Sequence, residues 1–99
     1  MDCLKCKRPF EKEDLLASMS GSIMGDEYTD VYFLCPVCRV FTVENWRDNF
    51  TGTETMYLSG PIEEEQGMER VRLIQQCPEP WDKKCRCEAH LEYFGNSLD

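Results

Sequence analysis

The residues of this 99-residue chain that are best suited to chemistry are seven cysteines and a single histidine. One group contains two Cys-x-x-Cys pairs separated by 28 residues, and its members are Cys3, Cys6, Cys35 and Cys38. The other group lies within 14 residues, and its members are Cys77, Cys85, Cys87 and His90. Thiolate sulfur and imidazole nitrogen are typical zinc ligands. Because the eight residues divide into two sets of four with none left over, the sequence predicts two metal ions.

The spacing within the first group is the one that a tight metal-binding turn requires. Two residues between cysteines allow both sulfurs of one turn to reach a single ion at about 2.3 Å. Pro36 lies inside the second pair, where its fixed φ suits a turn. Two such turns predict a tetrahedral site of four thiolates. The alternative interpretation is a set of four buried apolar cysteines.

This pattern resembles a known group of folds over residues 1–59. Cys-x-x-Cys followed by Cys-Pro-x-Cys at the end of an expected strand is similar to the zinc-ribbon and rubredoxin-like group, in which two knuckles on β-hairpins grip one metal ion. Rubredoxin-like electron carriers usually have glycine directly after the second cysteine of each knuckle, whereas this chain has Lys7 and Arg39. The difference favours structural zinc over iron. The resemblance implies little about activity, because the fold serves many functions.

The argument for the second group is physical, because its spacing resembles no family closely. Three cysteines and one histidine form a standard closed zinc set. Lys83, Lys84 and Arg86 flank these thiols and are expected to lower their pKa, which favours the thiolate form that a metal needs. Two alternatives stay open. The three cysteines could form a redox-active trio beside a single metal site, or the ligands of the two sites could interleave along the chain.

The metal is expected to be zinc at both sites, with iron or an iron–sulfur cluster as the alternative, because the same thiolates suit both metals. A closed four-ligand site has no open position for water or substrate. If His90 is a ligand, no histidine remains as a general base. The chain also has no phosphate-binding loop and no nucleophile elbow. We therefore expect no enzyme activity and no small-molecule substrate.

The charge of the chain points to a protein partner. The formal net charge is −8, and seven thiolates with two divalent ions change it to −8 − 7 + 4 = −11. Such a protein is repelled by nucleic acid, so we expect a partner protein with a basic surface. The alternative is a nucleic-acid-associated zinc ribbon that uses the basic residues near the knuckles. These residues are Lys5, Lys7, Arg8, Lys83, Lys84 and Arg86.

The expected location is the cytoplasm, without contact with a membrane. The sequence begins Met-Asp-Cys-Leu-Lys-Cys, without an apolar run of the length of a signal peptide. No segment approaches the roughly 18 apolar residues of a membrane span. In a reducing compartment thiols remain available for metal, and an odd number of cysteines argues against a framework of disulfides alone.

The expected architecture is a single α+β domain over residues 1–99, with a zinc-ribbon-like β module at 1–59 and a helical, metal-binding extension at 60–99. The expected elements are a knuckle at 1–9, a short helix at 11–19, a loop at 20–27, strands at 29–34, 40–43 and 53–58, and helices at 61–76 and 88–94. Pro61 is expected in the first helical turn, Gly67 weakens that helix, and Gly95 is the expected stop after the last helix.

The two tryptophans are expected to pack in the core or against a knuckle, because aromatic side chains cover much of a small core. These residues are Trp46 and Trp81. A tryptophan that is exposed instead becomes a candidate contact for a partner protein.

Overall fold

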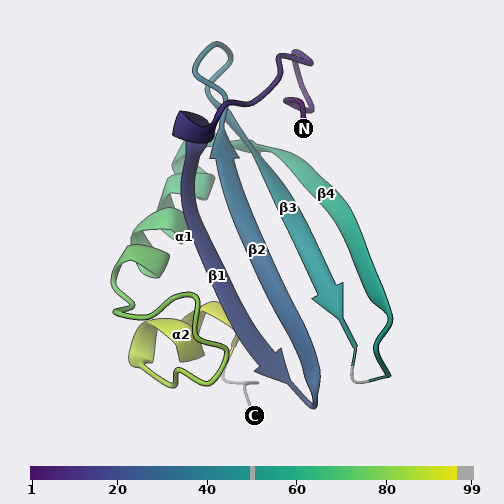
Figure 1. Ribbon diagram of the computed structural model, residues 1–99. Coiled ribbons are helices and arrows are strands. Elements are labelled where there is room, and N and C mark those ends of the chain that lie inside the picture. Colours follow the sequence, from purple (N-terminus) through teal and green to yellow (C-terminus); the bar gives the residue numbers. More distant parts are fainter. Residues whose placement is uncertain (50, 96–99) are drawn as a thin grey trace.

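The computed structural model describes residues 1–49 and 51–95. Its four antiparallel strands lie side by side in chain order (Figure 1). The strands are β1 (Leu15–Ile23), β2 (Asp26–Leu34), β3 (Val40–Asp48) and β4 (Glu54–Glu63). A 3-10 turn, η1 (Lys12–Asp14), precedes the sheet, and the helices α1 (Glu64–Gln75) and α2 (Glu88–Tyr93) follow it. The predicted α+β class is confirmed.

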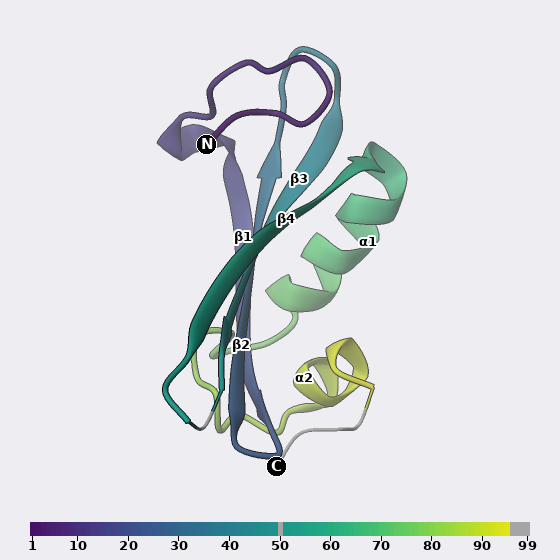
Figure 2. The same cartoon turned by 90° about the vertical axis from the view of Figure 1, so that its right-hand side faces the viewer.

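Both α-helices pack against the same face of the sheet, as the edge-on view shows (Figure 2). Successive residues of a strand point to opposite faces, so alternate side chains of the sheet face these helices. The core lies between the two layers and includes Met19 and Phe41 from the strands and Val71 and Ile74 from α1, all fully or almost fully buried. Among the described residues, no helix has the length and apolar character needed to span a lipid bilayer.

The two groups of cysteines lie toward different ends of the sheet. The first Cys-x-x-Cys pair is in the N-terminal loop, where a bridge between Asp2 and Pro9 closes a short hairpin. The second pair forms the turn between β2 and β3, next to that loop (Figure 1). The cysteine–histidine group belongs to α2 and the loop before it, which pack toward the other end of β1 and β2.

The prediction of a helix over 11–19 and a loop over 20–27 is wrong. After the short η1 turn, β1 and β2 form one long antiparallel hairpin. Its turn is Met24 and Gly25, whose φ angles of 52° and 88° are both positive, as a common two-residue hairpin turn requires. Strand formation depends on neighbouring strands more than on local preference, and pairing with β2 along the length of β1 outweighs the helical preference of 11–19.

The helix expected over 61–76 begins later than predicted. Strand β4 continues across residue 60, where the composition changes, and Glu63 still pairs with β3. Pro61 therefore lies in the strand and not in the first helical turn. The first turn of α1 contains Glu64 and Glu65, where negative charge is stabilised by the helix dipole.

The remaining elements are confirmed with different bounds. The strands expected at 29–34, 40–43 and 53–58 correspond to β2, β3 and β4, each of which is longer. The helix expected at 88–94 corresponds to α2, and Gly95 has the left-handed φ of 66° of a helix stop.

Helix α1 lies directly on the sheet at Gly67. A Cβ atom at this position would overlap the fully buried ring of Phe41. The sequence interpretation treats Gly67 as a weakness of the helix, because glycine is a poor helix former. The structure gives Gly67 a packing role, since the missing side chain makes room for the ring.

A polar network fastens α2 to the sheet. The hydroxyl of Tyr93 donates a hydrogen bond to Oδ2 of Asp30 at 2.7 Å and lies 2.6 Å from the hydroxyl of Tyr32. Arg47 donates to the other oxygen of Asp30 at 2.9 Å. Burial, together with the nearby negative charge of Asp30, raises the pKa of Tyr93, so its hydroxyl stays protonated as a donor. The helix that carries His90 is thereby held on β2.

We predict that Gly67→Ala destabilises the protein although alanine is the better helix former by about 1 kcal/mol. The new methyl group meets the Phe41 ring, and overpacking a core costs about 1–3 kcal/mol. Gln66→Ala, at the exposed neighbouring position, is the matched control and should be nearly neutral. Urea unfolding of the metal-loaded proteins measures both changes. A Gly67→Ala variant as stable as the parent protein would contradict the packing role.

Candidate metal centres

The two knuckles of the first group have the same backbone hydrogen bonds. The N–H of Lys7 donates to the carbonyl of Cys3 at 2.9 Å, and the N–H of Cys3 donates to the carbonyl of Arg8 at 2.9 Å. The second knuckle repeats both bonds at the equivalent residues, at 3.0 Å. Two turns of one shape therefore face each other across the first group.

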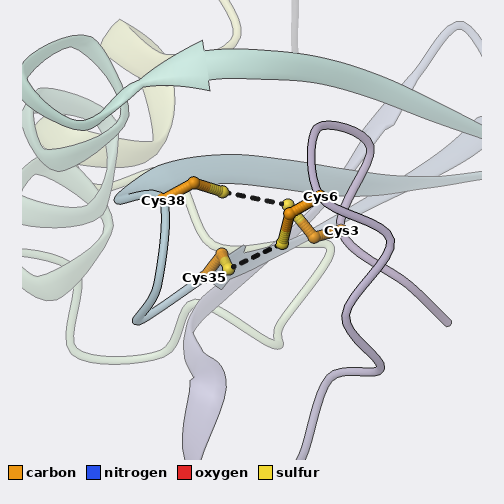
Figure 3. Close-up of side chains that lie close together, drawn as sticks. All are labelled: Cys3, Cys6, Cys35 and Cys38. Carbon is orange, nitrogen blue, oxygen red and sulfur yellow. Dashed lines mark hydrogen bonds between the residues drawn. The ribbon is translucent and has the colours of Figure 1, made fainter.

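The four sulfurs of this group gather at one point (Figure 3). Cys3 Sγ lies 3.4 Å from Cys38 Sγ, and Cys6 Sγ lies 3.6 Å from Cys35 Sγ. All four lie within 4.8 Å of one another. A disulfide requires about 2.0 Å, whereas sulfurs around a tetrahedral ion with bonds of about 2.3 Å lie about 3.8 Å apart. The arrangement is that of a four-thiolate metal site.

The residue after each knuckle adopts the conformation that glycine usually supplies. Lys7 and Arg39 have φ angles of 67° and 57°, in the left-handed region that costs a residue with a side chain roughly 1–2 kcal/mol. The absence of glycine, which the sequence interpretation uses as an argument against iron, therefore leaves the knuckle geometry unchanged. The preference for zinc has to rest on other grounds.

Backbone N–H groups prepare a thiolate at Cys35. Burial acts to raise the pKa of its thiol, but hydrogen bonds from the N–H groups of Cys38 and Val37, with contributions from neighbouring thiols, lower this pKa to about 6. Burial and the thiol groups around Cys38 raise the pKa of that residue to about 12. One sulfur thus carries charge at neutral pH while its neighbour keeps a proton, which a metal ion must displace.

The second group also brings its donor atoms together. Cys77 Sγ lies 3.7 Å from Cys85 Sγ and 3.0 Å from Nδ1 of His90. The three sulfurs and the ring nitrogen all lie within 4.8 Å of one another. Cys87 is the N-cap of α2, and its sulfur accepts a hydrogen bond from the N–H of His90 at 3.4 Å. The start of the helix therefore places two of the four donors.

The ring of His90 is oriented by the sheet. His90 is fully buried, and its Nε2 lies 2.6 Å from the carbonyl oxygen of Ser20 on β1. A carbonyl accepts only, so Nε2 donates to it and Nδ1 is the ring nitrogen directed at the sulfurs. Metal-bound histidines are held in this way by a partner on their other nitrogen. Ser20 is the residue that sequence reasoning misses, since it contributes a main-chain atom and no side-chain pattern marks it.

The loop that carries Cys85 is attached to the sheet at two further points. The N–H of Ser20 donates to the carbonyl of Pro80 at 2.8 Å. Lys83 Nζ lies 2.6 Å from a carboxylate oxygen of Glu27. Lys83, one of the basic residues expected to lower the pKa of the thiols, therefore pairs with a carboxylate of β2 and helps to position the loop. Burial and the neighbouring thiols raise the pKa of Cys77, so the expected lowering does not hold for that thiol.

The structure brings the eight predicted ligand residues together in the predicted sets of four, and the sets do not interleave. The prediction that the tryptophans lie in the core is wrong, because Trp46 and Trp81 are 42% and 69% exposed. Comparison of the chain with protein-family models, with curated proteins and with solved structures gives no match. The resemblance to the zinc-ribbon group therefore rests on the knuckles alone.

We predict that Lys7→Gly is more stable than Lys5→Gly by about 1 kcal/mol or more. Glycine relieves the left-handed strain at position 7, whereas at position 5, in the same knuckle, it only adds freedom to the unfolded chain. Chemical unfolding of the two metal-loaded variants measures the difference. Equal destabilisation by both substitutions would show that the left-handed conformation carries no cost.

We predict that metal affinity falls as the pH falls. The raised pKa values of Cys38 and Cys77, both about 12, mean that these thiols hold protons at pH 7 in the metal-free protein. Each proton that metal displaces lowers the affinity about tenfold for each pH unit of acidification. Competition for zinc with a chromophoric chelator between pH 6 and pH 8 measures the slope. An affinity independent of pH would contradict this account of the thiols.

Proposed function

We propose that this protein is a structural zinc protein, whose two closed sites hold a small domain in the shape required to bind another protein. The observation that carries the proposal is the placement of His90. Its Nδ1 lies among three cysteine sulfurs while a main-chain carbonyl engages Nε2. This is the arrangement of a zinc-bound histidine with its outer partner, and simple packing of an imidazole does not require it.

The proposed ions act by cross-linking segments that lie outside the strands of the sheet. At the first site an ion would join the N-terminal loop to the turn between β2 and β3, and at the second site it would join the loop after α1 to α2. A structural zinc site contributes on the order of 10 kcal/mol of apparent binding energy, enough to decide whether a domain of this size folds. Four protein donors leave no position for substrate, so we propose no catalytic role.

A second candidate function is supported by the knuckle backbone. Because Lys7 and Arg39 adopt the left-handed conformation found where rubredoxin-like proteins have glycine, an iron ion would meet the same geometry at the first site. The protein would then transfer electrons. We rank zinc first because the second site contains an imidazole within a closed set of three thiolates, which is a standard zinc arrangement.

The charge and the surface support a protein partner. The net charge of −8 disfavours a phosphate backbone, and two of the basic residues near the knuckles already pair with carboxylates, Arg8 with Asp14 and Lys83 with Glu27. The exposed Trp46 is a candidate contact on the sheet. We propose a partner with a basic surface, in a reducing compartment such as the cytoplasm, where thiols stay available for metal.

We predict two zinc ions per chain and no visible colour in protein purified without oxygen or added metal. Cys38→Ser and Cys87→Ser should each lose one ion and unfold locally around a different site, so each variant is the control for the other. Metal analysis with an absorbance spectrum and amide NMR spectra measure these outcomes. Iron with a visible band would favour the electron-transfer function, and retention of both ions by either variant would contradict the two-site proposal.

A further inference from the structure

Strand β4 forms an uncovered edge of the sheet. It pairs with β3 on one side, and no described residue pairs with its other side. All residues from 54 to 58 are exposed, so over this stretch both faces of the strand are accessible to solvent. An edge strand presents a row of unpaired N–H and C=O groups to which another chain can add.

The usual protection of an edge is missing from this stretch. Natural edges are blunted by lysine, by proline, by bulges or by short length. The irregular register opposite Phe41–Val43 and the Gly60–Pro61 pair both lie beyond Leu58, whereas 54–58 is regular and contains no lysine. At the other edge of the sheet, the N–H of Ser20 on β1 is already bonded to the loop carbonyl of Pro80.

Apolar side chains gather on the face of the sheet opposite the helices, next to this edge. Phe41 and Val43 are buried on the helix side, so Trp46 points to the opposite face. Met56 is opposite Trp46 in the register and shares that face with Leu58, and the three side chains are 42%, 45% and 38% exposed. A hollow of about 530 Å³ lies between Met56, Leu58 and the N-terminal knuckle.

Acidic residues lie among these apolar side chains. Glu44 is opposite Leu58 in the register, and one of its oxygens accepts a hydrogen bond from the indole N–H of Trp46 at 2.6 Å. Glu54 begins β4 and lies on the same face as Met56, two residues away. The open face therefore has the sequence acidic, apolar, apolar along β4 at Glu54, Met56 and Leu58.

We propose that an extended segment of a basic partner protein pairs with residues 54–59 of β4 as a fifth, antiparallel strand. Strand addition of this kind takes its affinity from main-chain hydrogen bonds and its specificity from alternate side chains. The side chains opposite Leu58, Met56 and Glu54 would be apolar, apolar and basic, which gives the pattern apolar-x-apolar-x-Lys/Arg. The inference rests on the proposed role in protein binding and specifies the partner's chemistry.

A second copy of this chain fits the edge less well. Two β4 strands paired antiparallel would bring the acidic faces of two chains with a net charge of −8 each together, and like charges across an interface are unfavourable. A basic segment has the complementary charge.

The test uses the zinc-loaded full chain and the capped peptide Ser-Ile-Thr-Val-Thr-Lys-Ser, in which Ile, Val and Lys alternate. Titration followed by amide NMR should shift residues 54–59 and protect from hydrogen exchange those of their amides that point away from β3, and Trp46 fluorescence should change. The same peptide with alternate backbone amides N-methylated, or with Glu in place of Lys, should bind at least tenfold more weakly. Equal binding of these control peptides, or shifts centred on α1 and α2, would overturn the proposal.

Two variants of the protein test the face as well as the edge. Met56→Lys places a cation among the apolar side chains and should weaken peptide binding at least tenfold. Thr55→Lys adds the same charge at the adjacent exposed position on the other face and should change binding less than threefold. Equal effects of the two variants, or dimerisation through β4 in light scattering, would overturn the proposal. Metal content is measured on each sample. If a sample retains two zinc ions but does not bind the peptide, the result contradicts the fifth-strand proposal and not the proposed metal sites.

Discussion

Thiolates that lie 3.4–3.7 Å apart repel one another unless a cation or shared protons lie between them. This constraint governs both ends of the molecule. The knuckle backbone lowers the pKa of Cys35 while Cys38 retains its proton, so the first group is part thiolate and part thiol in the absence of metal. A divalent ion would allow all the sulfurs to ionise, and the segments that carry them would then be held at one point.

The sheet connects the two metal centres to the core. Strand β2 begins at the turn that joins it to β1 and ends at the second knuckle. Asp30, near the middle of β2, accepts the hydrogen bond from Tyr93 that fastens α2 to the sheet. Strand β1 supplies the Ser20 carbonyl that orients His90. A change in the sheet is therefore expected to reach the second site through two independent contacts. The helices cover one face, which leaves the other face and the β4 edge available for a partner.

The features that can be predicted from the sequence are those that depend on the spacing of residues close together in the chain. The Cys-x-x-Cys spacing places two sulfurs within a single turn, so Cys3, Cys6, Cys35 and Cys38 can be assigned as metal ligands before the fold is known. Cys87 and His90 are close for a similar reason, because they are separated by about one helical turn. The stop at Gly95 is local in the same sense.

The errors concern interactions between distant parts of the chain. The segment 11–19 has helical preference, but its Leu15 and Ala17–Met19 pair with β2, and no local pattern reveals that partner. From the sequence alone Gly67 is expected to weaken the helix, whereas in the structure it makes room for the ring of Phe41. Ser20 acts through a carbonyl that every residue possesses. Trp46 is exposed because both helices pack on the opposite face, which depends on how the sheet is covered.

X-ray absorption at the zinc edge of the two-zinc protein counts the donor atoms around the metal and so decides whether both sites are closed. Two closed structural sites require four-coordinate zinc with seven sulfurs and one imidazole nitrogen shared by two ions, at about 2.3 Å and about 2.0 Å. Sulfur-only coordination would exclude His90 as a ligand. More than one nitrogen or oxygen donor for the two zinc ions together, or more than four donors around either ion, would contradict two closed structural sites.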